Sequence, residues 1–382
     1  MNARRVTPWC MLAVLACGGD SATAPHAVSL LITGRAERGL IVHVNVQLAG
    51  DTTVTTASAI TVTPADAATV LANGDVSLAK AGPLTVTGST ADGRSASTVV
   101  TVALPPTIVF DGLATGNRDV YRMSLDGQDL KRLTTNVSDD VHPSATGSIV
   151  VFNSYRDGNS ELYAMTIDGT NEKRLTTSAS NEAQPALSAD GKRVAYSTNV
   201  SGFPRVWLAT LDLASAAPLS ATAALSDAAF GSASTVEASP AWAPASDRLA
   251  LMTTATPTGG AGLFTANAAA HASPALMSGS GTQIVEVEPS WSFDGFRIVY
   301  AAANAGVTEL WVRDLRTAAI TQLTTDTGSS GQPAWLPDGR VVFTTFNGQA
   351  ATLRWVDPAF PTVLHAIPTP GLLAEHAAPV RP

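Results

Sequence analysis

The chain has 382 residues, of which 45% are hydrophobic and only 14% are charged, so it has enough apolar material for more than one folded core. Its formal net charge is −8, and it has no cluster of Lys and Arg. This argues against nucleic-acid binding, because contacts to phosphate supply most of that affinity.

Residues 1–16 have the pattern of a short secretory signal peptide. Arg4 and Arg5 precede an apolar run that is much shorter than the ~20 residues needed to span a bilayer. Val14-Leu15-Ala16-Cys17 then resembles a bacterial lipobox. The resemblance implies cleavage before Cys17, acylation of this cysteine and firm attachment to a membrane.

The residues around this motif indicate the membrane to which the protein is sorted and leave one alternative to the lipoprotein interpretation. Gly18 follows the cysteine, which resembles an outer-membrane sorting signal in bacteria with two membranes, and residues 17–26 read as a flexible tether. The alternative is an ordinary secretory signal with an incidental cysteine, and Cys10 offers a second, less well placed cleavage site. These are the only cysteines, so the folded part can hold no disulfide framework and no cysteine-ligated metal.

Residues 27–104 alternate apolar and polar positions in short runs separated by turn residues. About seven half-buried strands in some 80 residues predict a β-sandwich. Residues 57–103 resemble the bacterial Ig-like family through Val70 before the Asn73-Gly74 turn and through the strand Gly82-Pro83-Leu84-Thr85-Val86-Thr87. The family's usual tryptophan is missing. The resemblance implies an Ig-like domain that acts as a spacer, and Pro105-Pro106 then forms a stiff joint.

The chain after this joint contains an internal repeat. One copy reads Glu182-Ala183-Gln184-Pro185-Ala186-Leu187-Ser188-Ala189-Asp190-Gly191, and another reads Glu286-Val287-Glu288-Pro289-Ser290-Trp291-Ser292-Phe293-Asp294-Gly295. The repeat prolines are Pro143, Pro185, Pro240, Pro289, Pro333 and Pro379. Their spacing of roughly 40 to 55 residues is typical of four-stranded propeller blades.

These motifs resemble the TolB-type propeller repeat over residues 107–382. The phrases Glu161-Leu162-Tyr163 and Leu175-Thr176-Thr177 match later parts of that repeat. The fold class that we predict is therefore all-β, a six-bladed β-propeller preceded by an Ig-like β-sandwich. Asp-Gly pairs supply the positive φ of tight hairpins, and Trp242, Trp291 and Trp335 should fill the wedges between blades rather than stack on a sugar or cofactor.

The tail predicts how the ring closes. Thr107-Ile108-Val109-Phe110 begins the propeller at a strand equivalent to Val194-Ala195-Tyr196, so the first blade lacks its innermost strand. Residues 375–380 have the pattern of that missing strand, and supplying it would protect the open edges of the ring.

The sequence shows no catalytic motif. It has no Gly-x-Ser-x-Gly elbow, no His-Glu-x-x-His helix and no phosphate-binding loop. Residues 157–161 resemble the start of a calcium loop but lack its later ligands, so a hairpin turn is expected. The six histidines are scattered, although His142 and His376 fall in the first and last repeats, two positions apart in repeat register. Two readings of this pair stay open: a metal pair, or histidines at the surface or the channel rim.

A predicted binding rim comes from the position three residues before each repeat proline. We expect these residues to converge at one mouth of the channel: Asp140, Glu182, Glu237, Glu286 and His376, with Glu375 and His142 beside them. Two interpretations stay open. The carboxylates either accept backbone hydrogen bonds within their own turns, or together attract a basic peptide or a cation, with the histidines adding pH sensitivity.

The sequence thus predicts a monomeric, lipid-anchored scaffold of the cell envelope, facing the periplasm or the cell surface. Its propeller rim would engage a protein or peptide, as the resemblance to the Tol–Pal component implies, without a cofactor, a metal or enzymatic activity. Two alternatives remain: a propeller lyase or hydrolase acting on polysaccharide, and a channel that binds a glycan or another small ligand.

Overall fold

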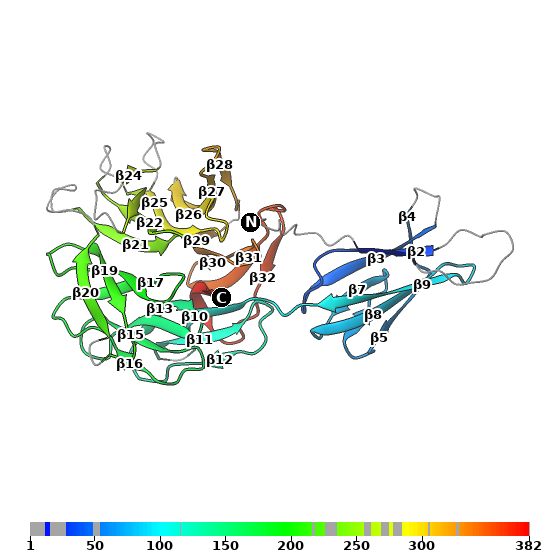
Figure 1. Ribbon diagram of the computed structural model, residues 1–382, viewed down its shortest axis with the longest axis horizontal. Helices are drawn as coiled ribbons and strands as arrows, with labels where there is room; N and C mark the ends of the chain where they lie inside the picture. The colour runs from blue at the N-terminus through cyan, green and yellow to red at the C-terminus, as the bar shows by residue number, and fades with distance from the viewer. Residues whose placement is uncertain are drawn as a thin grey trace. The chain divides into compact units, whose positions relative to one another are not determined.

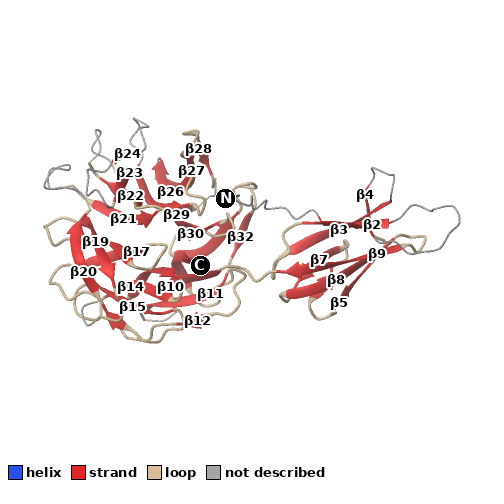
Figure 2. Ribbon diagram, in the orientation of Figure 1, coloured by secondary structure: helices blue, strands red, loops and turns tan. Residues whose placement is uncertain are grey.

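The computed structural model (Figure 1) describes residues 12–15, 28–48, 54–114, 116–215, 218–225, 235–255, 261–268, 275–277, 285–304, 306–325 and 328–381. Every regular element within these ranges is a β-strand, as Figure 2 shows. None of these residues forms a long apolar helix of the kind that crosses a membrane. The chain divides into two compact units, Met1–Pro105 and Pro106–Pro382.

The first unit consists of two antiparallel sheets that share one hydrophobic core. The larger sheet has the order β1-β2-β3-β7-β6, with β4 on β3, and the smaller has the order β5-β8-β9. Its strands are β1 (Leu12–Leu15), β2 (Val28–Thr33), β3 (Ile41–Leu48), β4 (Val54–Thr56), β5 (Ala59–Thr63), β6 (Ala68–Val70), β7 (Asp75–Leu78), β8 (Gly82–Ser89) and β9 (Ser95–Val102).

Alternating side chains build the core of this unit. Leu30, Val44 and Val76 from the larger sheet pack with Leu84 and Val100 from the smaller one. This is the sandwich arrangement that period-2 patterning favours. Strand β1 falls within the predicted signal peptide and pairs with β2, so cleavage before Cys17 would remove it and leave β2 at the sheet edge.

The second unit is a ring of six blades. Blade 1 has β10 (Thr107–Leu113), β11 (Arg118–Ser124) and β12 (Lys131–Arg132), and blade 2 has β13 (Asp140–Thr146), β14 (Ile149–Ser154), β15 (Glu161–Thr166) and β16 (Lys173–Arg174). Blade 3 has β17 (Glu182–Leu187), β18 (Arg193–Thr198), β19 (Arg205–Leu211) and β20 (Leu219–Ala224). Blade 4 has β21 (Glu237–Trp242), β22 (Arg248–Thr253), β23 (Gly262–Asn267) and β24 (Ala275–Leu276). Blade 5 has β25 (Val285–Trp291), β26 (Arg297–Asn304), β27 (Val307–Asp314) and β28 (Ile320–Gln322). Blade 6 has β29 (Ser329–Trp335), β30 (Val341–Asn347), β31 (Ala350–Val356) and β32 (Leu364–Ala366).

The tail closes the ring as its pattern predicts. Strand β33 (Leu373–Arg381) runs antiparallel to β10 and supplies the innermost strand of blade 1. It also pairs in parallel with β13 of blade 2, at Ala145 and Thr146. Blades 1 and 2 therefore form one continuous eight-stranded sheet, whereas the other four blades are separate four-stranded sheets.

The innermost strands all carry a β-bulge, which falls at the repeat proline in blades 2 to 6. In β17, for example, the register against β18 shifts between Ala183 and Ala186, which leaves Gln184 and Pro185 outside the ladder. The first bulged residue adopts positive φ in every blade: His142, Gln184, Ser239, Glu288, Gln332 and His376, at 50–55°. A bulge suits proline, which has no N–H to donate.

This bulge corrects the predicted register of the tail. The shift in β33 leaves out His376 and Ala377, so Ala377 occupies the proline position and Pro379 does not. The physical reason is that the bulge needs a residue whose N–H is not used in the ladder, and alanine can fill that place as proline does. His376 is consequently equivalent to His142, rather than two positions away from it.

The tryptophans lie between blades, as predicted. Trp242 joins a core of blades 3 and 4, Trp291 one of blades 4 and 5, and Trp335 one of blades 5 and 6. All three are at most 2% exposed, so none offers a face to a sugar. The preceding blade places an arginine over each ring: Arg193 over Trp242, Arg248 over Trp291 and Arg297 over Trp335, at 4.5–5.1 Å. These cation–π contacts add to the packing that holds the blades together.

The recurring Leu-Thr-Thr phrase fastens the outer strand of a blade. The hydroxyl of its first threonine accepts a hydrogen bond from a backbone N–H of the third strand, from Val120 to Thr134, from Leu162 to Thr176 and from Leu310 to Thr324, at 2.8–2.9 Å. The leucine before it is buried in each copy. The phrase therefore has a structural role in the blade.

Candidate functional site

The candidate site is the central channel of the propeller. A cavity of about 180 Å³ is lined by residues from all six blades, including the six bulge residues with positive φ and the prolines that follow them. Non-glycine residues in this conformation are strained, and such strain often accumulates at functional sites. Here the bulge turns these side chains toward the axis, so the polar character of the channel is set by one residue from each blade.

Hydrogen bonds between neighbouring blades hold several of these side chains. The backbone N–H of Ser239 donates to Gln184 Oε1 at 3.0 Å, and that of His376 donates to Gln332 Oε1 at 3.1 Å. The N–H of Gln332 donates to Glu288 Oε2 at 2.7 Å. In these three cases the N–H that the bulge removes from its own ladder finds an acceptor in the preceding blade. These links pre-organise the channel.

Two histidines meet in the channel. The rings of His142 and His376 are tilted at 44°, with centroids 3.9 Å apart. His376 Nδ1 lies 2.8 Å from Asp111 Oδ1, and its Nε2 lies 2.7 Å from the side-chain amide of Gln332. Asp111 is fully buried and also accepts from Arg118 Nη1 at 2.5 Å. The sequence analysis did not identify Asp111 as a neighbour of these histidines, because it lies on β10, the second strand of blade 1.

The pKa values of the two histidines are shifted in opposite directions. Burial and, secondly, the charge of the neighbouring His376 lower the pKa of His142 from 6.5 to about 3. Burial also acts to lower the pKa of His376, but the hydrogen bond and charge of Asp111, with Glu375 and Glu288, raise it above 6.5 overall. Of the two rings, His376 therefore binds a proton more readily than His142.

Glu288 provides an acceptor that faces the channel. Its Oε2 accepts the Gln332 N–H, while its Oε1 has no partner among the residues that the structure describes. Burial raises the pKa of this carboxyl group, with the backbone hydrogen bond and His376 opposing the rise. Such a group gains most from a ligand that donates a proton or brings a positive charge.

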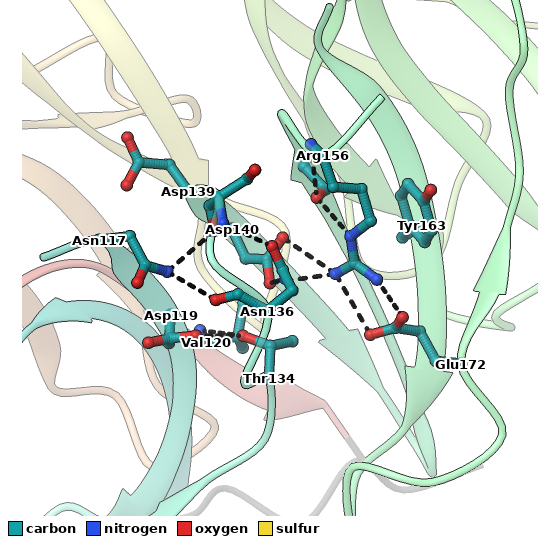
Figure 3. A network of polar contacts seen from close by, with 12 residues as sticks. Asn117, Asp119, Val120, Thr134, Asn136, Asp139, Asp140, Arg156, Tyr163 and Glu172 are labelled. Carbon is teal, nitrogen blue, oxygen red and sulfur yellow. Dashed lines mark hydrogen bonds and ion pairs between the residues drawn. The ribbon is translucent and has the colours of Figure 1, made fainter. Parts of the chain in front are cut away.

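The predicted acidic rim is located elsewhere. Asp140 is fully buried and binds Asn136 and Arg156 within blade 2, in the network of Figure 3. Glu182 accepts hydrogen bonds from Ser178 Oγ at 2.7 Å and Thr198 Oγ1 at 2.8 Å. Neither carboxylate belongs to the described lining of the channel.

Glu237 and Glu375, two further members of the predicted rim, are also bonded outside the described lining of the channel. Glu237 is fully buried, accepts the N–H of Val206 at 3.1 Å and lies 3.6 Å from Arg205. Glu375 pairs with Arg118, and the side chain of Glu286 is outside the described part of the chain. Neither interpretation describes these contacts: Asp140 and Glu182 accept hydrogen bonds from side chains, and Glu237 accepts a backbone N–H from β19 of the preceding blade. The residues that do converge are those one position before the proline, including His142 and His376.

The segment that resembles a calcium loop is a turn that holds its own blade together. Asn159 Nδ2 donates to the carbonyl of Ser178 at 3.1 Å, and Asp157 accepts from the Tyr163 hydroxyl at 2.5 Å. Glu161 is buried against Arg174 at 3.0 Å. No group of three potential metal ligands occurs among the described residues. Cys17, the predicted lipidation site, lies outside those residues.

Comparison with known proteins agrees with this geometry. The family model for the TolB beta propeller domain matches residues 106–228. TolB from Acinetobacter baumannii aligns with a TM-score of 0.61 at 14% identity, over 93% of this chain and 83% of that one. The propeller is TolB-like. No curated protein sequence matches the chain.

Other solved structures share the fold but differ in function. Hydrazine synthase of Kuenenia stuttgartiensis aligns with a TM-score of 0.58 at 15% identity, over 72% of this chain and 47% of that one. A chain of a nidogen/laminin complex aligns with a TM-score of 0.55 at 10% identity, over 72% of this chain and 98% of that one. One is an enzyme and the other forms a protein complex, so the fold alone does not select a function.

Proposed function

We propose that this chain is a binding scaffold of the cell envelope, anchored through a lipid on Cys17. In this proposal the N-terminal sandwich is an Ig-like spacer, and the TolB-like propeller binds a protein or peptide partner. The partner contacts the end of the channel that carries Glu288, His142 and His376, and no reaction takes place there.

The observation that carries this proposal is the free carboxylate oxygen of Glu288 within a fixed polar ring. Gln184, Gln332 and His376 are already held by neighbouring blades, so the ring loses little conformational freedom when a partner binds. A Lys, Arg or other basic group from the partner would pair with Glu288 Oε1 and remove the cost of ionising a buried carboxyl group. The net negative charge of the chain also favours a basic partner.

An enzyme acting on polysaccharide is the second candidate, because His142, His376 and Glu288 do meet in one channel. The geometry disfavours it. Both ring nitrogens of His376 already have partners, and burial lowers the pKa of His142 to about 3, which makes it a weak base. A general base needs a free nitrogen and a pKa near the working pH.

Capture of envelope proteins by the purified protein tests the proposal. Glu288→Gln should abolish the salt-sensitive part of the capture while leaving the melting temperature unchanged, because glutamine occupies the same bulge position at Gln184 and Gln332. Glu172→Gln is the matched control, since Glu172 pairs with Arg156 outside the channel. Equal capture by wild type and Glu288→Gln would contradict the proposal, and cleavage of any member of a glycan panel would favour the enzyme.

A further inference from the structure

The Arg381 side chain crosses the channel at the end opposite to the histidines. Arg381 ends β33, five residues after His376, which corresponds to roughly 15 Å along a strand. Its carbonyl accepts the N–H of Gly147 in blade 2 at 2.7 Å. Its Nη1 donates to the carbonyl of Trp242 in blade 4 at 3.4 Å, and its guanidinium lies 5.7 Å from the ring centroid of Phe293 in blade 5. Blades 2 and 5 face each other in a ring of six, so the side chain spans the opening.

Arg381 has no acidic partner among the described residues. Burial lowers its pKa, and no carboxylate opposes this shift. Neither Nε nor Nη2 donates to a protein acceptor in the described part of the chain. The aspartates of the hairpins at this end are already bonded within their own turns or to other arginines: Asp190 to Ser188, Asp247 to Arg193, Asp294 to Ser292 and Asp338 to Arg340.

Four other arginines of the propeller interior contrast with Arg381. Arg118, Arg156, Arg174 and Arg205 are also largely removed from water, and each pairs with a buried carboxylate. A guanidinium that is taken out of water without a counter-charge costs free energy, and removing one partner of a buried pair is strongly destabilising. A ligand that supplies the missing anion would offset that cost.

We propose that this end of the channel is a binding site for a carboxylate carried on a short aliphatic stem. The planar fork of Arg381 matches the two oxygens of a carboxylate. The adjoining walls are apolar at Ala145, Leu187, Ala334 and Ala378, and the cavity of about 180 Å³ has room for a few carbon atoms behind the carboxylate. A free short-chain acid and an acidic side chain of a peptide both have this chemistry.

The site is distinct from the surface in the proposed function. It lies at the other end of the channel and recognises the opposite charge. The Arg381 variants leave Glu288 and the two histidines in place, so failure of this proposal would not decide whether a partner binds at their end, and the reverse also holds.

Titration of the purified protein with two probes tests the site. The probes are butyrate and the peptide acetyl-Gly-Glu-Gly-amide, added at constant ionic strength with chloride as the reference anion. We expect saturable binding of at least one probe by calorimetry and a melting temperature that rises with its concentration. Arg381→Gln should weaken this binding tenfold or more, because it removes the charge-assisted hydrogen bonds. Binding of butyrate alone assigns a small-molecule ligand, and binding of the peptide alone assigns a protein ligand.

Two controls keep the result interpretable. Arg316→Gln is matched, because Arg316 also lies over a phenylalanine ring, that of Phe296, but is paired with Asp314. It should bind the probes as wild type does. A form extended by two glycines after Pro382 tests whether the last carboxylate competes with the probes, and it should also bind them unchanged.

Three results would overturn the proposal. The first is that neither probe binds. The second is that Arg381→Gln binds both probes as wild type does, whatever its melting temperature. The third is binding that appears only in the glycine-extended form, which would make the chain's own terminus the partner of Arg381.

Discussion

Acidification should destabilise the propeller through His142. Burial lowers the pKa of this ring from 6.5 to about 3, whereas in the unfolded chain it would titrate near 6.5. Between these two values the unfolded chain binds a proton that the folded protein does not accept. The contribution of His142 to stability is therefore complete above pH 6.5 and is lost as the pH falls toward 3, with a slope of up to about 1.4 kcal/mol per pH unit.

The magnitude can be isolated by substitution. From pH 6 to pH 4, wild type should lose on the order of 2 kcal/mol of unfolding free energy more than His142→Gln. Glutamine is a conservative choice, because Gln184 and Gln332 adopt the same positive φ at the equivalent positions. His376→Gln should act on the other side of neutrality. The pKa of His376 is raised, so its contribution is complete below pH 6.5 and is lost as the pH rises through its folded value.

Urea titrations followed by tryptophan fluorescence are the assay. Six of the seven tryptophans lie after Pro106 and the other is Trp9, so the signal reports on the propeller. His43→Gln is the control, because His43 is an exposed residue of the first unit. A difference between wild type and His142→Gln that stays constant from pH 7 to pH 4 would refute the reasoning.

Two further predictions concern contacts within the propeller, at Glu182 and at β33, and a third concerns the lipid anchor at Cys17. Burial and the adjacent Glu161 raise the pKa of Glu182 above 4.5, so its contribution to stability is lost as the pH rises through the folded value. Glu182→Gln should therefore show a smaller loss of unfolding free energy between pH 5 and pH 8 in the same urea assay, and parallel pH profiles would argue against this. Deleting residues 372–382 removes the partner of β10 and β13 and should cause aggregation or a markedly lower melting temperature; a truncated protein that melts like the parent would show that β33 is dispensable. Cys17→Ser should move the protein from membranes to the soluble fraction or leave the precursor unprocessed, and an intact mass of the wild type with an unmodified N-terminus downstream of Cys17 would exclude the anchor.

The repeat made the propeller predictable from the sequence. Asp-Gly pairs require positive φ, and Gly191, Gly295 and Gly339 adopt it at 68–89°. Large apolar side chains are needed to fill the space between blades, and the tryptophans provide them. Both signals are local and recur with the period of a blade, so each copy supports the others.

The candidate site was less predictable because its contacts join distant blades. The carboxylates three residues before the prolines recur, but they are bonded to nearby strands and loops, within the blade at Asp140 and Glu182 and to the preceding blade at Glu237. The polar channel residues differ from blade to blade, as Ser239, Glu288 and His376 show, so no repeat pattern marks them. Asp111 meets His376, and Arg381 reaches the channel, through pairing of β33 with β10 and β13, which a linear pattern does not specify.

The register of the tail shows the same limit. Pro379 offered a proline at a suitable spacing, but the bulge is defined by backbone geometry and fell at His376-Ala377. That difference of two residues decided which side chain faces the channel. In blades 2 to 6 the residue just before the repeat proline leaves the ladder, so this position in the sequence, and not the one three residues before the proline, marks the side chain at the channel.

Site-specific photo-crosslinking in cells tests the central claim most directly. A photoreactive amino acid would replace Gln184 at the channel in one strain, and Val200 in a loop between two strands of blade 3 in another; Val200 is 51% exposed. The account predicts a discrete protein adduct at position 184 that weakens when Glu288→Gln is added, and no such adduct at position 200. Adducts of equal yield at both positions, or an adduct at 184 that is indifferent to Glu288→Gln, would contradict binding at the channel.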